Sequence, residues 1–130
     1  MPTVTKANAE QIYREAHAAA LEASQAADPT PMIVGSPTTP FGSDIDPTKT
    51  VYYVADGLCG FAWVTITPAR GPMVTYLKSI GTGYKGYYGG YRVSMRMGGQ
   101  SYERKQQAAS AFAKVLQGYG IECYVESRLD

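Results

Sequence analysis

Histidine and cysteine are scarce in this chain: its 130 residues include one histidine, His17, and two cysteines, Cys59 and Cys123. A zinc centre would need several such residues at recognisable spacing. A cysteine nucleophile needs a base within hydrogen-bond reach, and His17 is the one histidine that could serve Cys59. We therefore predict no metal site, no cofactor and no catalytic residue, and an enzyme with a dispersed site ranks last among the functions considered.

The chain also lacks an excess of charge of either sign. It has 12 Lys and Arg residues and 11 Asp and Glu residues, which give a net charge of +1. Long nucleic acid usually requires a broad basic track, so this class of partner is disfavoured and an anion would be bound by a local cluster. The apolar runs are too short to cross a membrane, and the N-terminus lacks the charged start and apolar core of a secretory signal. We expect a cytoplasmic protein with no membrane partner.

The two cysteines lie within apolar, strand-like segments. Without an export signal, reduced and buried thiols are the favoured interpretation, and a disulfide between adjacent strands is the alternative. The length fits a single domain over residues 1–130.

Hydrophobic periodicity and turn residues predict an element order of α-β-β-β-α-β-α-β. This order predicts an α+β fold: one mixed β-sheet with an N-terminal helix, a short middle helix and a C-terminal β-α-β passage. A strand over 73–77 is the alternative to the middle helix. The predicted helices cover 8–28, 72–80 and 101–118, and the predicted strands cover 31–34, 50–54, 59–67, 91–97 and 121–127.

The segment 59–67 gives the strongest strand signal, and its alternate residues point to opposite faces. Phe61, Trp63 and Thr65 share one of these faces. Both faces are mostly apolar, which predicts a central strand covered on both sides.

Two loops stand out between these elements. Residues 35–50 form a Pro-rich surface loop that holds the pair Asp44 and Asp46, and a solvated loop is favoured there over a cation site because no third ligand stands nearby. Residues 82–90 form a Gly/Tyr-rich loop. Tyrosine rings can stack on a base, glycines let a ligand approach the backbone, and the neighbouring cations suit a phosphate.

The segment "RMGGQSYERK" leads from a predicted strand into the last helix, with Ser101 as N-cap. The first amides of a helix are unsatisfied donors with partial positive charge, which suits an anion. An ordinary capped turn, and a loop whose tyrosines pack on the protein's own surface, are the structural alternatives. The candidate ligand-binding residues of the two segments are Tyr84, Lys85, Tyr87, Tyr88, Arg92, Arg96, Gly98, Gly99, Gln100, Ser101 and Arg104.

Patches along the chain, "CGFAWVTITPA", "YGGY", "GQSYERKQQAASAFAKVL" and "GIECYVESRLD", resemble a family of small proteins encoded by tailed phages and prophages. The resemblance covers most of the chain from Pro31 onward and implies a phage gene product acting in the bacterial host cytoplasm. It supplies no catalytic residue. The residues that carry the likeness at the last helix and strand are Gln100, Ser101, Glu103, Arg104, Lys105, Ser127, Arg128 and Asp130.

These observations favour a small, non-enzymatic binding protein, expected to be a homo-oligomer, that holds an anionic or nucleotide-like ligand. In a phage setting such a protein would counter host defence by sequestering a nucleotide signal. The alternative is an inhibitor or accessory factor that binds a host or phage protein through its tyrosine-rich surface.

Overall fold

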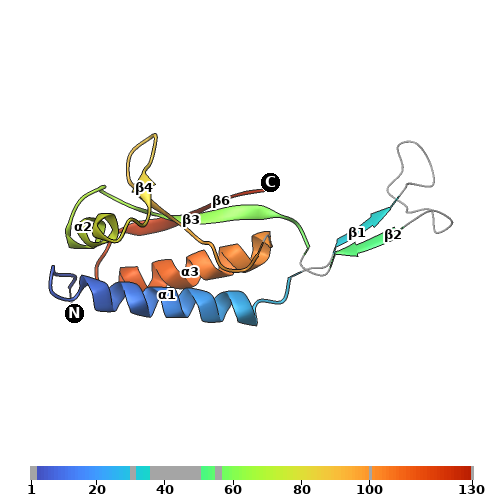
Figure 1. Cartoon of the computed structure of the whole chain (residues 1–130), viewed down its shortest axis with the longest axis horizontal. Helices are drawn as coiled ribbons and strands as arrows, with labels where there is room; N and C mark the ends of the chain where they lie inside the picture. Colours follow the sequence, from blue (N-terminus) through green and yellow to red (C-terminus); the bar gives the residue numbers. More distant parts are fainter. Residues whose placement is uncertain (1–2, 30–31, 36–50, 55–56, 100, 130) are drawn as a thin grey trace.

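Three helices and a four-stranded sheet make up the main body of the chain in the computed structural model, which describes residues 3–29, 32–35, 51–54, 57–99 and 101–129 (Figure 1). The predicted α+β class is confirmed. The elements, in chain order, are α1 (Ala9–Ala26), β1 (Met32–Gly35), β2 (Val51–Val54), β3 (Gly60–Ile66), α2 (Pro72–Ser79), β4 (Tyr84–Lys85), β5 (Tyr91–Ser94), α3 (Tyr102–Gly118) and β6 (Cys123–Leu129).

The main sheet has the strand order β4-β5-β3-β6, and each neighbouring pair is antiparallel. The prediction of a mixed sheet is therefore wrong. The reason lies in the crossovers: β3-α2-β4 and β5-α3-β6 each pass over one strand, so the strands they connect are parallel but not adjacent. Two interlocked β-α-β units of this kind give the ferredoxin-like arrangement.

The prediction of a single sheet is also wrong, because β1 and β2 pair with each other in a separate two-stranded sheet. This pair lies apart from the four-stranded sheet (Figure 1). The predicted Pro-rich loop and its Asp44 and Asp46 lie outside the described residues.

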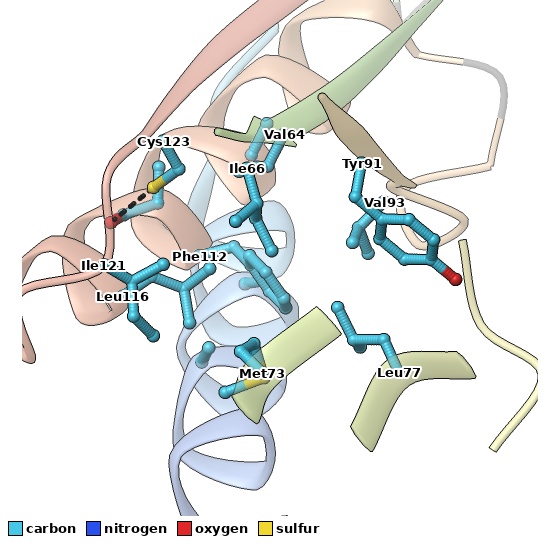
Figure 2. Close-up of a cluster of buried hydrophobic side chains, with 14 of the residues drawn as sticks. Val64, Ile66, Met73, Leu77, Tyr91, Val93, Phe112, Leu116, Ile121 and Cys123 are labelled. Carbon is cyan, nitrogen blue, oxygen red and sulfur yellow. Dashed lines mark hydrogen bonds between the residues drawn. The ribbon is translucent and has the colours of Figure 1, made fainter. Parts of the chain in front are cut away.

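The core lies between one face of the main sheet and the helices. Ala62, Val64 and Ile66 of β3 are buried on this face, as their alternation requires. Phe112 of α3 lies at the centre of the cluster, with side chains from β3, α2 and the start of β6 around it (Figure 2). Helix α3 therefore holds the sheet and α2 to a common core.

Helix α1 packs on α3 rather than on the sheet (Figure 1). Its face of small residues includes Ala16 and Ala20, which are fully buried. Small residues on α1 permit a close approach of its backbone to α3. The small-residue face of α1 is thus buried within the chain.

The opposite face of the main sheet has no helix on it among the described elements (Figure 1). The expectation that β3 would be covered on both sides is therefore wrong. Phe61 is 42% exposed and Tyr124, on the neighbouring strand β6, is 48% exposed. Exposed aromatic side chains on an uncovered sheet face mark a surface suited to binding.

Both cysteines are free thiols, as favoured from the sequence, with Cys123 buried and Cys59 half-buried. Burial raises the pKa of the Cys123 thiol to about 11. Within the described part of the chain, no helix combines the length and apolar character that crossing a membrane requires.

Candidate functional site

The uncovered face of the main sheet gathers alternate residues from its strands. The strand register sets Thr65 of β3 between Arg92 of β5 and Tyr124 of β6, and sets Trp63 opposite Glu126 of β6. Aromatic, cationic and anionic groups thus lie side by side on one flat surface. We call this surface the open face, and its members are Phe61, Trp63, Thr65, Arg92, Tyr124, Glu126 and Arg128.

Arg92 lies over Trp63, with 5.2 Å from its guanidinium carbon to the centroid of the ring. The stem of Arg92 runs beside the Gly/Tyr-rich loop: a Cβ on Gly86 would lie 3.0 Å from Nε of Arg92 and 2.6 Å from the carbonyl oxygen of Gly89. Glycine at position 86 therefore makes room for Arg92. In this position Nε of Arg92 is buried and has no hydrogen-bond partner among the described residues.

Glu126 holds the indole ring of Trp63 through a hydrogen bond to its N–H group. Its Oε1 accepts hydrogen bonds from Nε1 of Trp63, at 3.2 Å, and from Oγ1 of Thr65, at 2.6 Å. Hydrogen bonds to a carboxylate are stronger than those between neutral groups. The indole is thus oriented before any ligand binds, and its exposed surface is held in place.

Phe61 lies near two further cations. Nζ of Lys105 is 5.2 Å from the centroid of the Phe61 ring, and the guanidinium carbon of Arg128 is 5.5 Å from it. Lys105 comes from the first turns of α3 and is only 9% exposed. Two positive charges beside an exposed ring form a local cationic cluster, although the chain as a whole is almost neutral.

The Gly/Tyr-rich loop folds into the short strand β4 and a turn that returns to β5. The amide of Gly86 donates to the carbonyl oxygen of Gly90 at 2.9 Å, which closes the turn. Gly90 has a φ of +74°, and a Cβ there would lie 2.5 Å from Cγ2 of Thr65. Glycine allows both the positive φ and the close approach to β3.

At the tip of this turn, Tyr87 and Tyr88 are 88% and 91% exposed. Their rings meet edge to face, with centroids 4.8 Å apart. They contribute almost nothing to the core, so their exposure is not explained by packing.

The structure does not bring the two predicted candidate segments together. The Gly/Tyr-rich loop lies at the Ile66 end of β3, whereas Ser101 pairs with Cys59 just before the strand begins (Figure 1). β3 has seven residues, so these ends are about 20 Å apart by the rise of an extended strand. Tyr84, Lys85, Tyr87, Tyr88 and Arg92 remain together at the first end.

At the second end, Ser101 is the N-cap of α3 as predicted, and its Oγ accepts from the amide of Arg104. Arg104 turns back to α1, where its Nη1 donates to the carbonyl oxygen of Ser24 at 2.7 Å. Gly98 has a φ of +88°, and a Cβ there would lie 2.9 Å from Cβ of Arg104. These contacts account for the segment by local structure, and Gln100 lies outside the described residues.

A cavity of about 470 Å³ opens on the helix side of β5. Tyr13 and His17 of α1 and Phe112 of α3 form one wall, and the chain around Tyr84 and Arg96 forms the other. Arg96 lines this cavity and is not one of the residues that define the open face. Cys59 is not among the described residues that line this cavity with His17, and no group of three or more His, Cys, Asp or Glu within the described ranges could hold a metal ion.

Several residues of the candidate site were not among the sequence candidates: Phe61, Trp63, Tyr124, Glu126 and Arg128 of the open face, and Lys105 of α3 beside it. The alternation in 59–67 gave the orientation of Phe61 and Trp63, but apolar side chains alone were interpreted as covered. The sequence does contain one indication of this site. Glu126 and Arg128 occupy alternate positions of the last strand, which indicates that one face of that strand is exposed to solvent.

Comparisons of this chain with protein-family models, curated proteins and solved structures find no match.

Proposed function

We propose that this protein binds a nucleotide-like ligand, with a planar ring and a phosphate, on the open face around Trp63. The observation that carries the proposal is the stack of Arg92 on Trp63 in an uncovered antiparallel sheet. Proteins that bind unpaired bases use aromatic side chains on sheet surfaces as stacking platforms.

The chemistry of the open face fits both parts of such a ligand. Stacking of a base on an aromatic side chain contributes roughly 1–3 kcal/mol. Arg92, Lys105 and Arg128 supply cations beside the two rings. A buried donor without a hydrogen-bond partner costs about 1–3 kcal/mol of folding free energy. A ligand oxygen that accepts from Nε of Arg92 would recover this energy on binding.

The charge of the chain limits the size of the ligand. The net charge is +1, and the open face itself includes the carboxylate of Glu126. A long polyanion would gain little from such a surface. The proposal is therefore a mononucleotide, a cyclic dinucleotide or another short nucleotide, and sequestration of a host nucleotide signal by a phage protein is the biological role it would serve.

Isothermal titration calorimetry with mononucleotides and cyclic dinucleotides tests this function. We expect heat of binding from at least one of them, and a loss of that heat in Arg92→Ala. Arg14→Ala is the matched control, because Arg14 forms a surface ion pair with Glu10 on α1. Heat that is unchanged in Arg92→Ala, or no heat from any nucleotide at high protein concentration, would remove the proposal.

A second candidate function follows from Tyr87 and Tyr88. An almost fully exposed pair of tyrosines in edge-to-face contact suits a protein interface, where tyrosine is enriched among the residues that contribute most to binding. We propose a host or phage protein as the alternative partner. Capture of a protein from host lysate that is unchanged by the double substitution Tyr87→Ala and Tyr88→Ala would rule this out.

A further inference from the structure

Strand β6 is an edge strand, paired with β3 on one side only. It has seven residues, whereas β4 at the other edge has two. A long unpaired edge presents backbone donors and acceptors to another strand unless something blocks it. The described residues of β6 include no proline and no bulge in the register with β3.

The hydrogen bonds identify which backbone groups face outward. The amide of Thr67 donates to the carbonyl oxygen of Glu122 at 3.0 Å, so the backbone N–H and C=O groups of Glu122 point toward β3. Because strand residues alternate, Val125, Ser127 and Leu129 direct their N–H and C=O groups away from the sheet. The backbone groups of Cys123 also point outward. Its carbonyl oxygen already accepts from Nε2 of Gln117, so it is not free to pair with another strand.

Two apolar side chains along this edge are exposed. Val125 is 37% exposed and Leu129 is 51% exposed, both on the helix side of the sheet. On the open face, Glu126 and Arg128 take part in no ion pair with any described residue. Within the described part of the chain, Oε1 of Glu126 accepts the two hydrogen bonds and Oε2 accepts none. The edge thus offers two apolar groups and two opposite charges at alternate positions.

We propose that β6 pairs antiparallel with β6 of a second copy of this chain, about a two-fold axis at Ser127. In this register Val125 lies opposite the partner's Leu129, and Glu126 lies opposite the partner's Arg128. Positions 125, 127 and 129 exchange the backbone hydrogen bonds. Positions 126 and 128 are the non-hydrogen-bonded pairs, in which side chains approach most closely.

Charge selects this register over its neighbours. A two-fold axis at Glu126 would set two glutamates directly opposite each other, and an axis at Arg128 would do the same with two arginines, which is destabilising. An axis at Val125 would require the carbonyl group of Cys123, which Gln117 already engages. The axis at Ser127 instead forms two Glu–Arg pairs and two apolar pairs.

The dimer would extend the sheet to eight strands and join the two open faces into one surface. Arg128 would keep its position over Phe61 because a stacked guanidinium still has N–H donors for a carboxylate. The pairing needs no ligand, so it can be tested separately from nucleotide binding.

The test is sedimentation velocity without ligand on four proteins and one mixture. We expect the unaltered chain to be a dimer, and Glu126→Arg and Arg128→Glu alone each to raise the dissociation constant roughly tenfold or more, because each sets like charges opposite one another. An equimolar mixture of the two variants should restore the dimer, since the arginine introduced at position 126 of one chain then faces the glutamate introduced at position 128 of the other. Glu122→Arg, an exposed change just before β6 and outside the paired segment, should leave the dimer intact.

Recovery in the mixture also shows that both variants are folded. A monomeric unaltered chain, single variants that dimerise as tightly as it does, or a mixture that remains monomeric would each overturn the pairing. A dimer that forms while calorimetry detects no nucleotide would leave this interface standing and reject only the proposed ligand.

Discussion

The guanidinium carbon of Arg92 lies 5.2 Å from the centroid of the Trp63 ring, across the two central strands of a sheet whose outer face has no helix on it among the described elements. Three local features hold this pair in place: the glycine turn beside Arg92, the carboxylate of Glu126 on the indole N–H, and the antiparallel register of β3 and β5. This geometry exists without a ligand, which would lower the entropic cost of binding the proposed one.

Arg92→Ala should weaken the binding of a nucleotide roughly tenfold or more, because it removes both the cation and the group that stacks on Trp63. Arg92→Lys keeps the charge but not the planar group, and should recover only part of the affinity. Calorimetric titration of both variants measures the difference. Full affinity in Arg92→Ala would show that the ligand binds elsewhere, for instance in the cavity beside His17.

Gly86→Ala should destabilise the fold by about 1–3 kcal/mol, because the new methyl group would collide with the Gly89 carbonyl oxygen and with Arg92. Gly118→Ala is the matched control, since a Cβ at the end of α3 meets nothing within 4 Å. That change should be neutral or slightly stabilising. Denaturant unfolding of the two variants tests the prediction, and equal stabilities would contradict the role given to Gly86.

The buried thiol of Cys123 should make the protein less stable at high pH. Burial raises the pKa of this thiol in the folded state to about 11, from an ordinary value of 9.0. The unfolded chain therefore loses its proton first, so the free energy of unfolding should fall as pH rises from 9 to about 11. Below pH 9 both states keep the proton and the contribution is fully present.

Thermal unfolding between pH 8 and 11 checks this for the unaltered chain and for Cys123→Ala. We expect a smaller loss of stability across this range in the variant. Tyr91→Phe is a useful second control, because burial also raises the pKa of the Tyr91 hydroxyl. Identical pH profiles for the unaltered chain and Cys123→Ala would contradict the account of this thiol.

Local features of the fold were predictable from the sequence. Ser101 begins α3 and Gly81 follows the end of α2 with a φ of +70°, both as their capping preferences predict. Asn8 does precede α1, but its side chain accepts from the amide of Thr5 instead of capping the helix. The alternation of apolar and polar residues over 91–97 also matches the burial of Tyr91, Val93 and Met95.

Long-range features were not predictable in the same way. Strand β4 is two residues long and depends on pairing with β5, so no local pattern marks it. Phe61 and Trp63 are apolar whether or not a helix covers them, and hydrophobicity alone cannot separate the two cases. The candidate segments around Tyr87 and Ser101 are close in sequence, but the crossover from β5 to α3 carries them to opposite ends of β3.

Trp63 is the one tryptophan of the chain, and it lies at the centre of the proposed site. Titration of its intrinsic fluorescence with mononucleotides and cyclic dinucleotides therefore measures the central claim most directly, with free nucleoside and inorganic phosphate as controls. We predict a saturable change in Trp63 emission with a nucleotide, a weaker response to either control, and loss of the saturable change in Arg92→Ala. Emission that is unaffected by every nucleotide, while the protein remains folded, would contradict the proposed function.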